Sequence, residues 1–175
     1  MYDADQMAAQ AEQPAPNPVY GVGERRFEIT PPMDGAFGDP RLFRHPLLRG
    51  LLHSLLGEAM RLSGLTLVVS YPGAEKQHTH RDHPLLFDDP ALSSSLPPYA
   101  INVAVPLNRS RVVRPIVYMV CARTWFFDEI NHPMRPSLGM MLEDYNRLPE
   151  DVRLLVLRVF SQHARARFFV EPHDG

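Results

Sequence analysis

The pattern of apolar and polar residues predicts one amphipathic helix and three strands in the middle of the chain. Over residues 47–62, leucine and methionine recur at spacings of three and four, and Gly64 is placed to end this helix. Runs rich in β-branched residues predict strands over 65–70, 99–107 and 112–121. The third run is apolar throughout, which predicts a strand buried on both faces.

The pattern of apolar and polar residues is weaker toward the two ends of the chain. Residues 25–30 alternate briefly before Pro31 and Pro32, which predicts an edge strand. Pro149, followed by two acidic residues, predicts a helix running to about residue 165. Residues 1–20 are polar and contain spaced prolines, so we expect a flexible tail followed by a single domain over 21–175.

Composition narrows the class of protein. The chain has 175 residues, 45% of them hydrophobic and 22% charged, which is typical of one soluble globular domain. A net charge of −2 argues against a nucleic-acid partner. No stretch is long and apolar enough for a membrane span, no secretory signal is recognisable, and the single cysteine, Cys121, excludes an intramolecular disulfide. We therefore expect a cytoplasmic protein that does not bind membranes.

A cluster of metal-capable side chains follows the first predicted strand. If this segment is extended, His80 and Asp82 present an imidazole and a carboxylate on the same face. Two histidines and one carboxylate form the facial triad of non-haem Fe(II) oxygenases, which leaves positions open for a co-substrate and dioxygen. The pair supplies two of these three ligands. A His-x-Asp tripeptide also arises by chance in polar loops.

The surrounding motifs resemble the phytanoyl-CoA dioxygenase (PhyH-like) family. They comprise Tyr-Pro-Gly at 71–73, Gln-x-x-His-x-Asp-His-Pro at 77–84, the apolar run 99–107, Asn-x-Ser at 108–110, Arg-Pro at 114–115 and Ala-Arg-x-Trp-Phe at 122–126. The resemblance implies an Fe(II) and 2-oxoglutarate dependent oxygenase on a double-stranded β-helix, or jelly roll. The expected fold class is therefore mainly β with flanking helices (α+β).

The resemblance also implies roles for individual residues. His80 and Asp82 would bind iron, Arg114 would bind the far carboxylate of 2-oxoglutarate, and Gln77 would contact the metal ligands or the co-substrate. Arg109 and Arg111 are close enough in sequence to take the place of Arg114. His78 is a candidate for a compensating ligand, ahead of His132 and His163, although three ligands at i, i+2 and i+4 of one strand would span roughly 13 Å.

One departure from the family pattern changes the expected architecture. In the family, several dozen residues with further strands and the second iron histidine follow the strand that resembles 99–107, whereas here Leu107 is followed directly by Asn108. The resemblance implies that strands 65–70 and 99–107 flank strand 116–121 in one sheet, and we expect most of the opposing sheet to be missing. The result would be an incomplete jelly roll, truncated internally near 107–108. Helices or a partner chain would cover its apolar face, or the face would stay largely exposed. An exposed apolar face favours self-association.

Three hypotheses for function follow. The first is a dioxygenase that hydroxylates a small organic substrate with Fe(II), dioxygen and 2-oxoglutarate. The second is a catalytically impaired remnant or truncated isoform, acting as a weak metal-binding or interaction protein. The third is a cupin-like metal-binding module that does not use 2-oxoglutarate.

Overall fold

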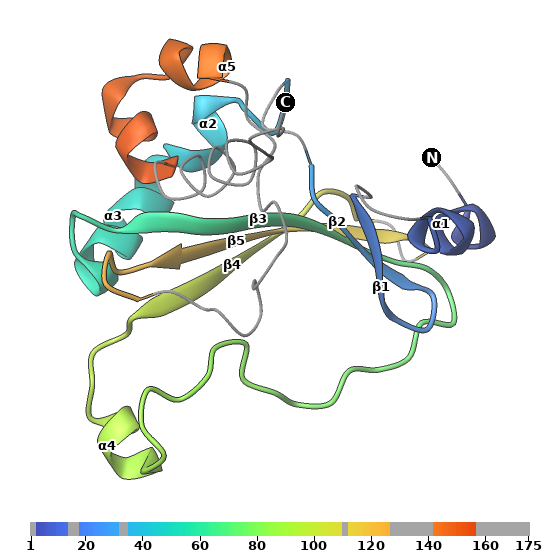
Figure 1. Ribbon diagram of the computed structural model, residues 1–175, viewed down its shortest axis with the longest axis horizontal. Helices are drawn as coiled ribbons and strands as arrows, with labels where there is room; N and C mark the ends of the chain where they lie inside the picture. Colours follow the sequence, from blue (N-terminus) through green and yellow to red (C-terminus); the bar gives the residue numbers. More distant parts are fainter. Residues whose placement is uncertain (1–2, 14–17, 32–34, 110–111, 127–141, 157–175) are drawn as a thin grey trace, which may run out of the picture.

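A computed structural model describes residues 3–13, 18–31, 35–109, 112–126 and 142–156. Its centre is a five-stranded antiparallel sheet with the strand order β1-β2-β3-β5-β4 (Figure 1). The strands are β1 (Val19–Gly23), β2 (Arg26–Ile29), β3 (Arg61–Ser70), β4 (Ala100–Pro106) and β5 (Arg114–Ala122). Together with the helices, this sheet makes an α+β fold. The described residues contain no second sheet facing the first.

The three strands at the centre of the sequence pair as expected. β5 lies between β3 and β4, with Val117 opposite Leu67 on one side and Val105 on the other. The expected flanking of strand 116–121 by strands 65–70 and 99–107 is therefore confirmed. The expected burial of this strand on both faces is only partly right, because Ile116 and Tyr118 are half-buried.

Helix α3 (Pro46–Leu56) confirms the amphipathic helix but ends earlier than predicted. Its C-cap is Gly57, which has a φ of 87°. Gly64 lies inside β3, where the register with β5 shifts between Leu62 and Gly64. The prediction that Gly64 ends the helix was wrong because Met60 and Leu62 are also buried, so the apolar pattern continues from the helix into the turn and the strand.

The N-terminal residues also differ from the prediction. Helix α1 (Ala4–Ala11) begins at a capping box in which Asp3 and Gln6 bond each other's backbone N–H groups. Met7 is buried in a small cluster with residues of β1, β2 and β3. Residues 4–11 are thus helical rather than an unstructured tail, because a local cap and a few apolar contacts hold them. β1 pairs with the outer side of β2, so β2 is not the edge strand that was predicted.

The two faces of the sheet differ in what covers them. On one face, which we call the helix-covered face, α2 (Pro40–Phe43), α3 and the helical residues 150–156 pack on the central strands. The main core lies there and includes Leu52, Leu56, Leu62, Leu65, Val117, Met119, Val152 and Val156. The apolar face of the sheet is therefore shielded by helices, one of the expected arrangements. The rest of the helix predicted to run to about residue 165 lies outside the described residues.

The opposite side, which we call the open face, carries the alternate side chains of the same strands. Thr66, Asn102 and Tyr118 share it, and all three are half-buried. The connection from β3 to β4 contacts this face where Asp82 bonds to Asn102, and it continues into the short helix α4 (Pro90–Ser94), as Figure 1 shows in green. Helix α5 (Leu142–Arg147) lies next to α2, away from this face (Figure 1). Among the described residues, no helix has the length and apolar content needed to cross a membrane.

Candidate functional site

A cavity of about 490 Å³ lies on the open face, between the strands and the loop that follows β3. Its loop wall is residues 77–80 together with Asp82 and His83. The strands contribute a mixed polar and apolar floor of Arg26, Glu28, Thr66, Val68, Asn102, Tyr118 and Val120. The His-x-Asp motif of the sequence thus faces the sheet across a hollow large enough for a small organic ligand.

His80 and Asp82 meet at the edge of this cavity. Nε2 of His80 lies 3.0 Å from Oδ1 of Asp82, and about half of each side chain is exposed. The segment is not a β-strand, so strand parity correctly predicted that the two side chains are neighbours but not the backbone that brings them together.

The second ring nitrogen of His80 determines how the first can act. Nδ1 lies 2.7 Å from the carbonyl oxygen of His78, and a carbonyl oxygen only accepts, so Nδ1 carries the hydrogen. In a neutral ring, Nε2 then presents a lone pair to the Asp82 carboxylate, which is also an acceptor. The short contact between them requires a proton or a cation. Histidines that bind metals commonly donate their other N–H to a backbone carbonyl in this way.

Asn102 connects this pair to the sheet. Its Nδ2 donates to Oδ2 of Asp82 at 2.6 Å, and its Oδ1 lies 3.0 Å from Nε2 of His83. The ring of His83 in turn packs edge-on against Phe126. Asn102 therefore positions the carboxylate from β4. Sequence analysis gave it no role, although an amide in an otherwise apolar strand was the available signal.

The other predicted site residues are only partly brought together. Gln77 and His78 line the same cavity, whereas Arg114 is exposed at the start of β5 and is not among the residues that line it. Arg109 is exposed beyond the end of β4. Arg111, His132 and His163 lie outside the described residues.

Arg26 is a guanidinium at this cavity that sequence analysis missed. It is 7% exposed, its Nε lies 3.3 Å from Oγ of Ser70, and it also donates to the carbonyl of Glu75. Ser70 pairs with Arg26 on one side and with Arg114 on the other, so the two arginines project from the same face, two strands apart. Nothing in the short β2 pattern distinguished Arg26 from a solvated charge.

The geometry of the His80–Asp82 pair fits two neighbouring ligands of one metal ion. Bonds of about 2.1 Å at right angles place two ligand atoms about 3.0 Å apart, which matches the observed separation. Within the described part of the chain, however, no three His, Cys, Asp or Glu side chains group closely enough to hold a metal ion. The described residues therefore bring together one imidazole and one carboxylate, two side chains of the expected type.

Comparisons with known proteins do not assign a function to the His80–Asp82 pair. No protein-family model matches the chain, and no curated protein matches it.

Proposed function

We propose that this chain is an Fe(II) and 2-oxoglutarate dependent dioxygenase of the PhyH-like class that hydroxylates a small organic substrate. The observation that carries the proposal is the His80–Asp82 pair, with its 3.0 Å separation and the Nδ1–H of His80 directed to the His78 carbonyl. Motifs that resemble those of the family surround this pair in the sequence. When bound, the iron would couple oxidative decarboxylation of 2-oxoglutarate to hydroxylation of the substrate.

In this proposal the protein residues bind and orient. His80 and Asp82 would hold the metal, and Asn102 would hold the second carboxylate oxygen of Asp82, Oδ2, away from it. An arginine would bind the far carboxylate of the co-substrate, since its planar fork matches a carboxylate in two parallel hydrogen bonds. Arg114 is the residue implied by the family resemblance. Arg26 is the alternative, because it lines the same cavity as His80.

The decisive experiment is an anaerobic titration of the purified chain with Fe(II) and 2-oxoglutarate. We expect the charge-transfer absorption of an iron-chelated keto acid to appear and saturate. It should disappear in His80→Ala and remain in His45→Ala, a control at an exposed histidine before α3. A band of equal strength in wild type and His80→Ala would contradict the proposal.

A second function is favoured by a specific observation, the lack of a third metal-binding side chain among the described residues. In that case the chain is a catalytically impaired remnant that binds metal weakly or acts through a partner. A two-ligand site binds metal much less tightly than three ligands do, so iron should be lost on gel filtration. Stoichiometric retention of iron would count against this alternative.

A further inference from the structure

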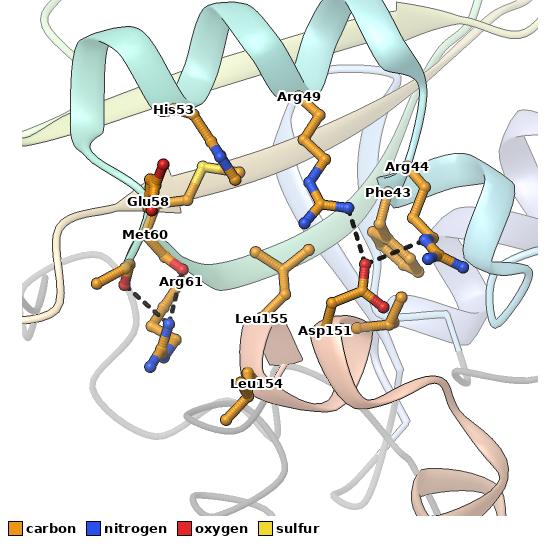
Figure 2. A pocket seen from close by; sticks show the side chains of 12 residues that line it. Phe43, Arg44, Arg49, His53, Glu58, Met60, Arg61, Asp151, Leu154 and Leu155 are labelled. Atoms are coloured by element: carbon orange, nitrogen blue, oxygen red, sulfur yellow. Dashed lines mark hydrogen bonds and ion pairs between the residues drawn. The ribbon is translucent and has the colours of Figure 1, made fainter.

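A second cavity, of about 350 Å³, lies on the helix-covered face and does not involve the His80–Asp82 pair. It is bounded by α3, by the turn between α3 and β3, and by helical residues 150–156. Figure 2 shows Arg49 and His53 descending from α3 on one side, with Leu155 and Asp151 opposite them. Its size falls in the range of small-molecule sites.

The polar lining of this cavity has an excess of positive charge. Three arginines line it (Arg44, Arg49 and Arg61) against two carboxylates (Glu58 and Asp151), which leaves one positive charge before His53 is considered. Arg44 and Arg49 both contact the same oxygen of Asp151, at 3.2 and 2.8 Å. One carboxylate oxygen of Asp151 thus forms ion pairs with two guanidinium groups.

Arg61 and His53 have no carboxylate partner in the described part of the chain. Nη1 of Arg61 donates to the backbone carbonyls of Ala59 and Met60, at 2.8 and 3.0 Å, and neither carbonyl carries a net charge. His53 makes no side-chain hydrogen bond to any described residue, although it is half-buried. Both groups therefore remain able to donate to an anion.

The rest of the lining is apolar. Phe43, Met60 and Val152 are buried at 6%, 4% and 1% exposure, and Leu154 and Leu155 complete the wall. An inorganic anion would leave this surface uncovered, while a neutral apolar ligand would leave Arg61 without a carboxylate partner among the described residues. The lining matches a molecule that has both parts.

We infer that this cavity is a binding site for a small organic carboxylate with an apolar body. The carboxylate is bound on the side of His53 and Arg61, and the apolar body packs against Met60 and Leu155. The site is separated from the open-face cavity by the sheet, so it does not depend on the dioxygenase proposal.

Calorimetric titration of the full chain with octanoate, octanol and octylammonium tests this inference. We expect octanoate to bind at least tenfold more tightly than octanol, and octylammonium not to bind. Equal affinity for octanoate and octanol, or no octanoate binding at millimolar concentration, would overturn it.

Variants locate the site and separate binding from folding. His53→Gln and Arg61→Gln leave the Asp151 ion pairs in place and should each weaken octanoate binding about five- to tenfold, with octanol unchanged. Arg147→Gln, at an exposed arginine of α5, is the matched control and should bind like wild type. Leu154→Trp, at a half-exposed position of the lining, should obstruct the cavity without removing a charge. Unchanged octanoate affinity in the folded His53→Gln/Arg61→Gln double variant would place the binding elsewhere and overturn the inference.

Discussion

Asn102 is the residue through which the sheet positions the candidate metal site. Replacing it with leucine keeps the side-chain size but removes the hydrogen bond to Asp82. Loss of such an outer contact typically weakens metal binding 10- to 100-fold, and we expect a change of about that size in the dissociation constant for Mn²⁺. Asn108→Leu, at an exposed asparagine outside the cavity whose Nδ2 lies 3.3 Å from the Val113 carbonyl oxygen, is the control. Equal Mn²⁺ affinity in wild type and Asn102→Leu would show that this bridge is not needed.

Cys121 is expected to be chemically inert in the folded protein. Its burial on the helix-covered face raises the pKa of the thiol to about 12. At pH 8 this leaves on the order of one thiol in ten thousand as the reactive thiolate. A disulfide reagent should therefore label native protein far more slowly than protein unfolded in guanidinium chloride. Rapid stoichiometric labelling of the native chain would contradict the burial of this strand.

At the scale of one element, two glycines of the α3 region should respond to alanine in opposite directions. Gly57 has φ 87° and ψ 160°, a conformation that other residues rarely adopt, while a Cβ there would meet nothing closer than Arg123 at 4.0 Å. The cost of Gly57→Ala is therefore backbone strain, and we expect the free energy of unfolding to fall by about 1–3 kcal/mol.

Gly50 is the matched position inside the same helix. A Cβ at Gly50 would have no heavy atom within 4 Å, so Gly50→Ala should raise the free energy of unfolding by about 0.5–1 kcal/mol. Urea denaturation followed by circular dichroism measures both changes. A stabilising Gly57→Ala would mean that α3 does not end at this glycine.

At the scale of the whole molecule, Asp151 joins helical residues 150–156 to Arg44, at the end of α2, and to Arg49 of α3. Burial by itself raises the pKa of this carboxyl, but the hydrogen bond from Arg49 and the charges of Arg44 and Arg49 outweigh it and hold the pKa below its usual value. The contribution to stability is then present above the unfolded pKa of about 3.9 and is lost as the pH falls through the folded value.

Asp151→Asn should therefore lower the free energy of unfolding at pH 7 and have little effect near pH 2. Half-exposed ion pairs contribute about 0.2–1 kcal/mol each, and a change of this size is expected. Glu150→Gln, at the neighbouring exposed carboxylate, is the control. If Asp151→Asn has the same effect at pH 2 and pH 7, the ion pairs are not the cause.

Local patterns in the sequence were sufficient to locate the main elements. The spacing of leucines located α3, and β-branched runs located β3, β4 and β5, because periodicity and propensity act between near neighbours. The same reasoning placed His80 beside Asp82, since these two residues are close along the chain. The predictions were wrong where a competing local feature was stronger, as at Gly57, which ends the helix before Gly64.

The tertiary structure alone decided which distant residues share a site. Strand register and the path of the loop after β3 bring Asn102 to Asp82, twenty residues apart, and they bring Arg26 to Ser70, which is forty-four residues away. The same long-range packing places His53 and Arg61 with helical residues 150–156 around the cavity on the helix-covered face. Such contacts depend on pairing and packing between segments far apart in sequence. No local pattern specifies that geometry, so only the folded chain could reveal it.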